Sequence, residues 1–563
     1  MTRDELHFLP LGGVGEFGAN LALYGYNGRW LMLDCGLAFA DETLPGVELL
    51  VPDVSFIEAQ RDKLAAIILT HAHEDHLGAV QYLWRKLRVP VYATPFAAAI
   101  LRSKLEDGGL IGEVPVHVVP VGGSVTLGDF TVSYIGVTHS ILEAHSVAIK
   151  TPVGTVVHTG DWKLDPDPRV GRLTDEPGLR ALGESGVLAV MGDSTNALSQ
   201  GHSGSEGALR PSLRKLVGDA KGAVAVSLFA SNAARIETIC DAAAANDRVV
   251  VMAGRSLWRT VAAARECGYL RDLPTLLEED EADHIPREHL LYLVTGCQGE
   301  QRAVLGRVAF GEHRNIKLHR GDTVIFSSKV IPGNEKPIAR IVNRFIRDGI
   351  HVVSERDHLV HVSGHPNRDE LKQMITWLRP KTVVPVHGEH RLLEAHADLA
   401  RSLGFRALVV NDGDRVRFTA DGPAEVIDQI ETGRLAVAGA TPVPIDATAI
   451  QARRRMMFNG AVTVILVLDA AGEPAAPARV LLRGVDLPEG LDDVMRKAAE
   501  DRVRDIPRPR RRENEEVDLA VRQAVRAEMR PHTNQRPAID VEIVRVGADS
   551  GAVPASRARG GVS

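Results

Sequence analysis

The sequence contains little cysteine, and the few cysteines lie far apart. Cys35, Cys240, Cys267 and Cys297 occur among 563 residues, and no two of them form a CxxC pair. Disulfide frameworks and thiolate zinc sites both depend on regularly or closely spaced cysteines. We therefore expect neither a disulfide-stabilised fold nor a zinc site built on sulfur.

Long apolar runs and a strong net charge are also missing. No stretch reaches the roughly 18 uncharged apolar residues that mark a membrane-spanning helix. The first residues, MTRDELHFLPLGG, carry charges where a signal peptide would have its apolar core. A net charge of −7 argues against nucleic-acid binding over the whole surface, although it leaves room for a local channel. The sequence predicts a cytoplasmic protein without a membrane segment.

The sequence does contain a dense cluster of metal-binding side chains. Residues 71–76 read His-Ala-His-Glu-Asp-His and directly follow the apolar run Leu64–Leu69. Imidazole nitrogens and carboxylate oxygens are ligands of Zn²⁺, and a turn lets neighbouring side chains converge. Solvated loop histidines are the alternative, but several ligand types in one turn favour a metal site. The cluster has enough donors to begin two sites, and it indicates a metal-dependent hydrolase.

Short apolar runs elsewhere also end in polar residues. Strand-like runs precede His139, Asp161, Asp193 and, much later, His387. Strands that share one edge of a sheet would bring such side chains together. Taken singly, a strand-end histidine is more often a surface residue, and a strand-end aspartate commonly caps a turn. Together with residues 71–76, however, they predict a dinuclear site in a layered α/β domain.

The order of these residues resembles the metallo-β-lactamase superfamily, whose ligand motifs run His-x-His-x-Asp-His, His, Asp, His. By that resemblance, His71, His73 and His139 would hold one zinc ion, Asp75, His76 and His387 the other, and Asp161 would bridge them. Asp34 also matches a family position, and we expect it to orient a ligand histidine. The resemblance implies two zinc ions per subunit, with Mn²⁺ or Mg²⁺ as alternatives. Such a pair activates water and neutralises charge on a phosphoryl group.

The spacing of the ligands indicates an inserted domain. His139 and Asp161 are 22 positions apart, whereas 226 positions separate Asp161 from His387. Strand-like runs alternate with helical stretches in the long interval, so the insertion should be a small α/β unit. An insertion at this place resembles the β-CASP branch of the superfamily. Five strings resemble the ribonuclease J family in particular: GDSTNA at 192–197, FASN at 229–232, IPGNE at 331–335, HVSGH at 361–365 and HGE at 387–389.

This resemblance implies roles for further residues. Asp75, Asp193 and His365 would be catalytic, with His365 stabilising the transition state or protonating the leaving oxygen. A pocket for the 5′-monophosphate of RNA would be formed by Ser231, Asn232, His361, Ser363, Gly364 and His365. Backbone N–H groups at the start of a helix suit a phosphate, although ordinary turn formation is the alternative for Ser, Asn and Gly.

The expected fold is a metallo-β-lactamase αββα sandwich with an inserted α/β β-CASP domain and a small C-terminal α+β domain. The expected boundaries are 1–205 and 355–425 for the sandwich, 206–354 for the insertion, 426–457 for a linker, 458–547 for the C-terminal domain and 548–563 for a disordered tail. We also expect a helix over Asp75–Leu87 with Asp75 as N-cap, and His145 at the surface. The four arginines of Pro507–Arg512 would contact RNA or form a solvated loop.

The resemblance implies a zinc-dependent ribonuclease that acts on single-stranded RNA in mRNA decay and rRNA maturation. Its activities would be 5′-to-3′ exonuclease, with preference for a 5′-monophosphate, and endonuclease. It would be a homodimer or homotetramer that meets other RNA-decay proteins. A small-substrate hydrolase of the same superfamily is the first alternative, but it has no need of the insertion. A non-catalytic RNA-binding subunit is the second, but it would be expected to have lost ligands, and all are present.

Overall fold

The computed structural model describes residues 2–41, 43–439 and 441–547, and the chain divides into two compact units. The first unit comprises the chain up to Phe39 together with Leu49–Pro442, and the second comprises Ala40–Glu48 and the chain from Val443 onward. The expected disordered tail, 548–563, lies outside the described residues. Within the described ranges, no helix combines the length and apolar character that crossing a membrane requires.

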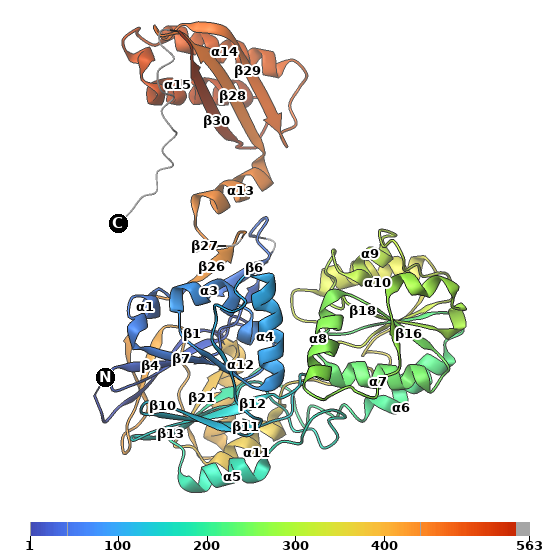
Figure 1. Ribbon diagram of the computed structural model, residues 1–563. Coiled ribbons are helices and arrows are strands. Elements are labelled where there is room, and N and C mark those ends of the chain that lie inside the picture. Colours follow the sequence, from blue (N-terminus) through green and yellow to red (C-terminus); the bar gives the residue numbers. More distant parts are fainter. Residues whose placement is uncertain (1, 42, 440, 548–563) are drawn as a thin grey trace. The chain divides into compact units, whose positions relative to one another are not determined.

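Two facing sheets form the centre of the first unit (Figure 1). The first sheet has the order β25 (Glu425–Gln429), β24 (Asp414–Phe418), β1 (Leu6–Gly12), β3 (Leu21–Tyr26), β4 (Arg29–Leu33), β7 (Leu64–Ile68), β8 (Val91–Ala93) and β9 (Val116–Val118). The second has the order β10 (Ser124–Leu127), β11 (Phe130–Gly136), β12 (His145–Thr151), β13 (Gly154–His158), β14 (Ala189–Asp193), β21 (Thr382–Val386) and β23 (Arg406–Ala407). Apolar side chains of both sheets pack into one core between them.

The burial of the strands follows from what covers them. In β11, Phe130, Val132 and Tyr134 are buried and the residues between them less so, as expected for a strand with one face on the core. β1 is buried along its whole length, because this strand lies inside a covered sheet. The covering helices are α1 (Ser55–Glu58), α3 (Val80–Leu87) and α4 (Pro95–Asp107) beside the first sheet, and α5 (Glu176–Ser185), α11 (Arg368–Leu378) and α12 (His390–Ser402) beside the second. The expected αββα sandwich is present.

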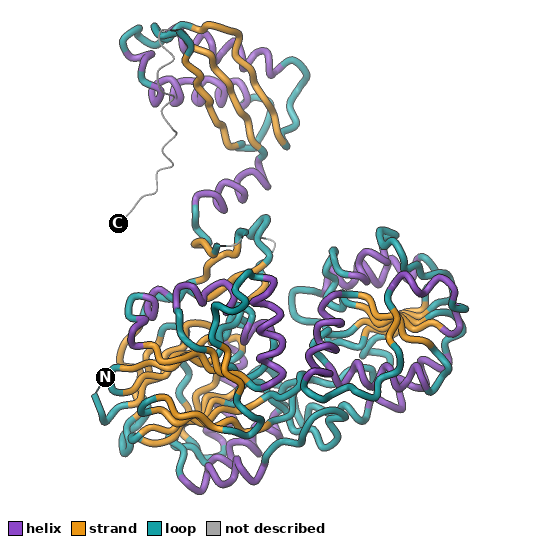
Figure 2. Tube along the Cα trace, viewed as in Figure 1, coloured by secondary structure: helices purple, strands orange, loops and turns teal. Residues whose placement is uncertain are grey.

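A third sheet, in which all strands are parallel, belongs to a unit that is inserted into the sandwich. Its strand order is β17 (Leu276–Leu277), β16 (Val249–Ala253), β18 (Leu290–Val294), β15 (Val224–Ser227), β19 (Thr323–Phe326) and β20 (His351–Val353). The helices around it are α6 (Leu209–Asp219), α7 (Ala233–Ala244), α8 (Arg255–Glu266), α9 (Val304–Ala309) and α10 (Glu335–Arg347) (Figure 2). Because helices cover the sheet, its central strands are continuous apolar runs and not alternating ones.

The inserted unit leaves and rejoins the sandwich at neighbouring strands. It lies in the chain between β14 and β21, and these two strands pair in parallel from Ala189 with Thr382 to Asp193 with Val386. The chain can therefore insert a whole α/β unit without separating Asp193 from His387, the residue that follows β21. This arrangement explains how ligands 226 positions apart can belong to one site.

A buried ion pair joins the inserted unit to the neighbouring segments. The guanidinium of Arg235 on α7 donates hydrogen bonds to both carboxylate oxygens of Glu206, at 2.9 and 3.0 Å, and also to the carbonyl oxygens of Ser327 and Val360. Arg235 is 1% exposed and Glu206 2%. Each charge depends on the other, because an unpaired buried charge is costly.

The segment 426–457, for which we expected a linker, contains strands and a helix. Most of β25 lies in it and pairs with β24, and β26 (Arg434–Val437) pairs with β6 (Leu49–Pro52), which in turn pairs with β5 (Ala38–Phe39). β27 (Pro442–Pro444) and α13 (Thr448–Asn459) follow. Leu435 and Ala436 are buried, so a short apolar stretch among Pro, Ala and Gly residues is enough to hold β26 to the sandwich.

The second unit contains a three-stranded sheet with two helices. β28 (Ala461–Leu468) pairs antiparallel with β29 (Pro474–Arg483) and parallel with β30 (Ala538–Arg545), and α14 (Leu491–Asp505) and α15 (Asn514–Met529) share its core. The α15 stripe expected from helical spacing, Val517, Val521, Val525 and Met529, is buried there. Arg511 of the arginine-rich segment is also buried, and it pairs with Glu473, so this arginine has a structural role.

Candidate metal centre and active site

Strand ends of both sheets deliver the polar residues to one place. Asp34 follows β4, His71 follows β7, Asp193 ends β14 and His387 follows β21. Asp161 lies three residues after the end of β13. The edge-of-sheet arrangement expected from the sequence therefore brings these side chains together.

The 71–76 cluster forms the entry to a very short helix, α2 (Glu74–Leu77). The expected single helix over Asp75–Leu87 is wrong, because the chain breaks between α2 and α3 at Gly78 and Ala79. The backbone N–H of Ala79 donates to Cys35 O at 3.0 Å, which ties the break to the strand-end loop. Asp75 is also not the N-cap, a position that His73 occupies, and its carboxylate instead approaches His76 and His387.

Two groups of potential ligands share Asp161. The first group is His71, His73, His139 and Asp161, and the second is Asp75, His76, Asp161 and His387; within each group the ligand atoms lie within 4.8 Å of one another. Asp161 Oδ2 lies 3.2 Å from His76 Nε2, 3.4 Å from His387 Nε2, and 3.8 Å from both His71 Nε2 and His139 Nε2. One carboxylate oxygen thus faces both groups, as a bridging ligand must.

The arrangement of the donor atoms suits metal ions better than it suits hydrogen bonds among the side chains themselves. His73 Nδ1 lies 3.1 Å from His71 Nε2 and 3.1 Å from His139 Nε2, so three ring nitrogens face a common point. Asp161 Oδ1 is buried and has no hydrogen-bond partner among the described residues. Burial holds the pKa of His71 and of His139 well below its ordinary value, which keeps these imidazoles neutral and their lone pairs available. Such a set of buried N and O donors suits Zn²⁺.

The second group carries more negative charge around His76, one of its two histidines. Burial alone would lower the pKa of His76, but the carboxylates of Asp161, Asp75 and Asp34 raise it well above its ordinary value. Several carboxylates around one imidazole therefore favour a positive charge at this point. A divalent cation meets that demand more fully than a single proton does.

Hydrogen bonds on the far side of the rings fix their orientation. His76 Nδ1 donates to Asp34 Oδ2 at 2.7 Å, which places the Nε2 lone pair toward the site, as expected for Asp34. Asp34 also accepts from the backbone N–H and the hydroxyl of Thr70. His139 Nδ1 donates to the carbonyl oxygen of Gly364 at 2.6 Å, so the HVSGH string contacts a candidate ligand directly.

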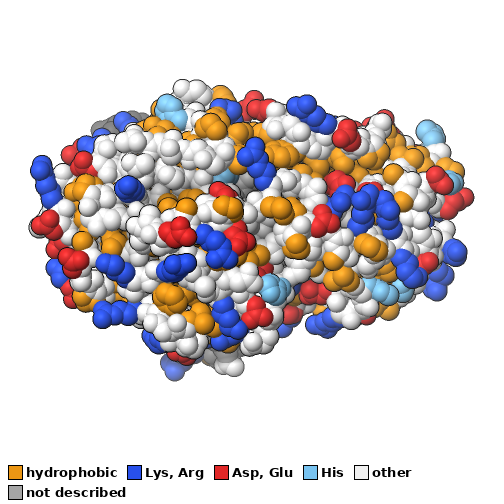
Figure 3. All heavy atoms as spheres, turned by 90° about the horizontal axis from the view of Figure 1, so that it is seen from below, with side chains coloured by type: hydrophobic (Ala, Val, Ile, Leu, Met, Phe, Trp, Pro, Cys, Tyr) orange, Lys and Arg blue, Asp and Glu red, His pale blue; other side chains and the backbone are white. Residues whose placement is uncertain are grey.

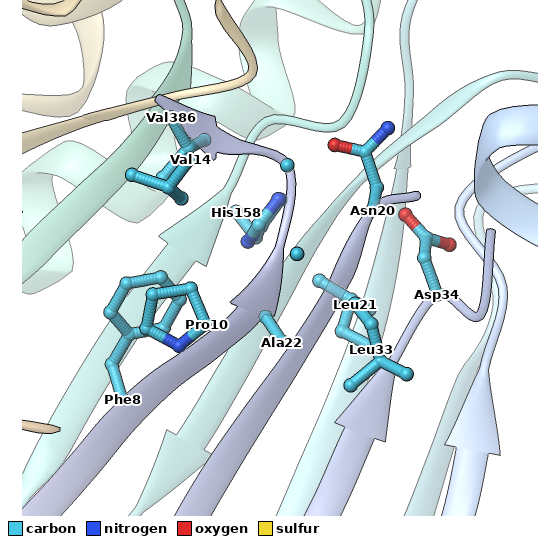
Figure 4. Close-up of a pocket in the computed structure, with 12 residues that line it drawn as sticks. Phe8, Pro10, Val14, Asn20, Leu21, Ala22, Leu33, Asp34, His158 and Val386 are labelled. Carbon is cyan, nitrogen blue, oxygen red and sulfur yellow. The ribbon is translucent and has the colours of Figure 1, made fainter. Parts of the chain in front are cut away.

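Asn20 is a site residue that the sequence did not reveal. Its Oδ1 accepts from His387 Nδ1 at 2.9 Å, and its Nδ2 donates to Asp75 O at 3.0 Å. A lone asparagine after a glycine-rich loop carries no recognisable signal. Asn20 and Asp34 also line a small cavity beneath the centre, shown in Figure 4, of about 10 Å³. That volume holds at most one water molecule, so this cavity is too small for a nucleotide.

His387 and Asp34 have left-handed backbone conformations, with φ of 54° and 58°. Non-glycine residues adopt this region at a cost, and such strain is often retained at functional sites. The His387 N–H donates to Gly13 O at 2.8 Å, which holds the strained residue in place. The direction of the His387 ring is therefore set by the loop before β3 as well as by β21.

His365 and Asp193 form a pair above the metal centre. His365 Nδ1 lies 2.8 Å from Asp193 Oδ2, and its ring stacks on the ring of His387. Burial opposes the charged form of His365, but Asp193, with Asp161 and Asp75 behind it, raises the pKa of His365 to about 9. Asp193, His365 and His387 also lie close enough to form a third potential ligand group. The His365 side chain is 23% exposed, so it can reach a substrate.

The residues expected to bind phosphate lie in two places. His361 and Ser363 line a cavity of about 330 Å³ together with Lys329, which the sequence analysis missed. His361 Nδ1 is buried without a hydrogen-bond partner in the described chain. Burial and the nearby cations of Arg235 and Lys329 lower the pKa of His361 to about 2.

Ser231 lies against the first ligand group, with Oγ 3.1 Å from His73 Nε2. Asn232 is occupied otherwise: its Oδ1 caps α7 by accepting from the Arg235 N–H at 2.9 Å, and its Nδ2 contacts Glu206. In this structure the side chain of Asn232 therefore acts as the N-cap of α7.

The expectation that His145 lies at the surface is wrong. This residue begins β12, where it is 1% exposed, and its Nδ1 donates to the carbonyl oxygen of Glu143 at 2.6 Å. It belongs to none of the three potential ligand groups found among the described residues. His145 is buried because it pairs in register with Gly136 and packs edge-on against Tyr134.

Comparison with protein families finds matches along most of the chain. Residues 14–225 match the metallo-beta-lactamase superfamily, 221–345 the ribonuclease J beta-CASP domain, 349–410 the Zn-dependent metallo-hydrolase RNA specificity domain, and 448–546 the ribonuclease J C-terminal domain. A solved structure of a protein of unknown function from Enterococcus faecalis V583 has a TM-score of 0.51 and 16% identity, and the match covers 73% of this chain and 100% of that one. That likeness concerns the fold alone.

Curated relatives are similar over nearly the full length. Ribonuclease J of Sinorhizobium meliloti is 44% identical over 556 residues, which cover 97% of this chain and 98% of the relative. Ribonuclease J of Mycolicibacterium smegmatis is 39% identical, over 88% of this chain and 90% of the relative. Such identity over almost the whole of both chains shows common membership of one family. With its sandwich, its insertion and its shared-aspartate centre, the chain belongs to the ribonuclease J family and is a metal-dependent ribonuclease.

Proposed function

We propose that this ribonuclease uses two zinc ions to remove nucleotides from the 5′ end of single-stranded RNA and also to cleave RNA internally. The observation that carries the proposal is the pair of ligand groups joined by Asp161, close to the HVSGH segment that also lines the 330 Å³ cavity. His71, His73 and His139 would hold one ion, Asp75, His76 and His387 the other. Bound there, the ions would supply an activated water and neutralise charge on the scissile phosphate, with Mn²⁺ or Mg²⁺ as alternatives.

The residues around the ions have separate tasks. Asp34, Asn20 and the Gly364 carbonyl hold the ligand rings so that their lone pairs face inward. His365, whose Nδ1 proton is held by Asp193, presents Nε2 to the substrate. The hydrogen bond to Asp193 favours the protonated form of His365, so Nε2 can donate a proton to the leaving 3′ oxygen.

The cavity next to the centre supports recognition of a 5′-monophosphate. His361 and Ser363 line it, and Lys329 adds a positive charge. His361 Nδ1 is buried beside this cavity and has no partner among the described residues, which supports a polar ligand at this place. A phosphate anchored here would set the scissile bond at a fixed distance along the RNA, which gives stepwise removal of nucleotides from the 5′ end.

The test of catalysis uses Asp75→Ala. This variant should lose turnover while it still binds single-stranded RNA, because the carboxylate serves the second ligand group and the RNA contacts of the cavity remain. Turnover is followed with 3′-labelled RNA and binding by fluorescence anisotropy. Cleavage at the wild-type rate by the purified variant would refute the assignment of the centre.

The test of 5′-end recognition uses the phosphate state of the RNA. Wild-type enzyme should degrade RNA with a 5′-monophosphate faster than RNA with a 5′-triphosphate, and His361→Ala should reduce the difference. Equal rates on the two RNAs would count against the pocket. Internal cleavage of a circular RNA, which has no 5′ end, measures the endonuclease activity separately.

The remaining parts of the proposal concern the cellular setting. We propose that the enzyme acts in the cytoplasm, in mRNA decay and rRNA maturation. It would form a homodimer or homotetramer and interact with other RNA-decay proteins. The C-terminal unit would support the assembly of subunits. Sedimentation of the full chain and of a chain ending before α13 tests this, because loss of the larger species in the shorter chain is the expected result.

A further inference from the structure

Phe17 gives the metal centre an exposed aromatic face. Its side chain is 36% exposed, and its ring stands edge-on to the ring of His387, with centroids 6.3 Å apart and an interplanar angle of 79°. Phe39, Phe310 and Phe458 are the other exposed phenylalanines of the described chain, and no ring contact to a candidate ligand is found for any of them within it. An exposed phenyl group beside a catalytic centre is available to a substrate.

The backbone holds this phenyl group in a fixed place. β2 (Val14–Gly15) pairs in parallel with β22 (Gly388–Glu389), immediately after His387. Gly15 and Gly18 flank the short loop with φ of 86° and 83°, a region that favours glycine. The Ala19 N–H donates to Leu37 O at 2.8 Å on the other side. Because both ends of the loop are anchored, little further ordering is needed when a ligand meets the ring.

The position of Phe17 relative to the two ligand groups indicates which nucleotide it meets. The HVSGH segment, which lines the phosphate cavity through His361 and Ser363, contacts His139 of the first group through the Gly364 carbonyl, whereas Phe17 contacts His387 of the second group. Phe17 and Gly364 therefore flank different halves of the centre. If the nucleotide to be removed lies on the side of the phosphate cavity, the next nucleotide lies on the side of Phe17.

The surface charge gives such a contact importance. On the face drawn in Figure 3, basic and acidic side chains are interspersed, and the net charge of the chain is −7. No uniform basic track is visible on that face in Figure 3. Stacking of bases on aromatic rings is the contact that tolerates any sequence, because every base has a π-face.

We propose that Phe17 is the stacking platform for the base of the nucleotide on the 3′ side of the scissile bond. The proposal rests on the 5′-to-3′ register proposed above. In this position the ring would hold the retained end of the RNA while His365 faces the bond to be broken. The ligand is a nucleobase of any kind, and the contact sets the position of the RNA.

The experiment is a double-mutant cycle in which the two altered groups are the Phe17 ring and one base of the RNA. Wild-type enzyme and Phe17→Ala each degrade 5′-monophosphorylated RNA that is either unmodified or abasic at the second nucleotide. Removing either the ring or the base should lower kcat/KM by about 5- to 160-fold, the range for one base–aromatic stack. Removing both should cost no more than removing one. Losses that multiply in the doubly altered pair would overturn the proposal.

Further variants separate stacking from packing. Phe17→Trp should keep wild-type kcat/KM, whereas Phe17→Leu, which has apolar bulk but no ring, should behave as Phe17→Ala does. Phe310→Ala removes an equally exposed ring, 37% exposed at the end of α9, and should change nothing. Zinc content equal to wild type in Phe17→Ala shows that the centre is intact, and loss of zinc would overturn the stacking role in favour of a packing role.

The products that wild-type enzyme releases from unmodified RNA test the proposed 5′-to-3′ register separately from the role of Phe17. Single nucleotides released from the 5′ end support the register, and the cycle is then read at the second nucleotide. If wild-type enzyme only cleaves internally, the register fails, and the cycle is read with the abasic position placed just 3′ of the mapped cut. Coupling there still supports Phe17, and multiplied losses still overturn it.

Discussion

Asn20→Ala is expected to weaken metal binding without unfolding the protein. The side chain is 9% exposed and makes two contacts that a bound metal would leave in place, from His387 Nδ1 to Oδ1 at 2.9 Å and from Nδ2 to Asp75 O at 3.0 Å. Partners behind a ligand histidine are typically worth about 10- to 100-fold in metal affinity. Because His387 serves the second ligand group, we expect a loss of this size at one ion, equivalent to about 1.4–2.7 kcal/mol.

Competition with a chromophoric chelator measures the zinc affinity of each ion in the purified protein. Asn20→Asp is the matched variant, since it keeps an acceptor for His387 Nδ1 but loses the donor to Asp75 O. It should therefore retain more affinity than Asn20→Ala. Zinc affinity and stoichiometry equal to wild type in Asn20→Ala would refute the claim that Asn20 orients His387.

The other predictions concern the general acid His365, the buried ion pair of Arg235 with Glu206, and the ion pairs of Asp241. Asp193→Asn should lower kcat by about 100-fold with little change in KM, because His365 loses the partner that holds its Nδ1 proton; an unchanged kcat in steady-state assays would contradict this. Arg235→Ala should cost about 3–5 kcal/mol in urea unfolding, because it leaves Glu206 buried and unpaired, whereas the Arg235→Met, Glu206→Met double variant should lose much less. Hydrogen bonds from Arg210 and Arg214 hold the pKa of Asp241 well below its ordinary value, so the stabilisation that Asp241 contributes is present above about pH 4 and fades as the pH falls. The stability difference between wild type and Asp241→Asn should thus shrink below about pH 4, and a constant difference would contradict it.

Much of the centre could be predicted because its ligands are of distinctive types in a distinctive order. A turn with His71, His73, Asp75 and His76 needs no tertiary information to be recognised as metal-binding. The strand-end positions of the later ligands followed from local apolar runs. The large interval before His387 was enough to indicate an insertion, and the pairing of β14 with β21 shows why that insertion is tolerated.

The rest depended on contacts between distant segments. Asn20 reaches His387 across 367 positions, and nothing local distinguishes it from a turn asparagine. His145 has neighbours that resemble a surface loop, yet pairing with β11 buries it. The break between α2 and α3 follows from a hydrogen bond to Cys35, which no helical periodicity could reveal. Tertiary structure overrides local pattern most strongly around the centre, where strained residues are retained.

The most direct test of the metal-dependent ribonuclease is cleavage of 3′-labelled RNA and DNA of the same sequence, with defined 5′ ends, after chelation and after return of Zn²⁺ or Mn²⁺. We expect no cleavage in chelator, recovery on return of either ion, a preference for RNA over DNA, and nucleotides released in order from a 5′-monophosphorylated end. Cleavage of RNA that persists at full rate in chelator would contradict the central claim that the shared-aspartate centre performs the hydrolysis.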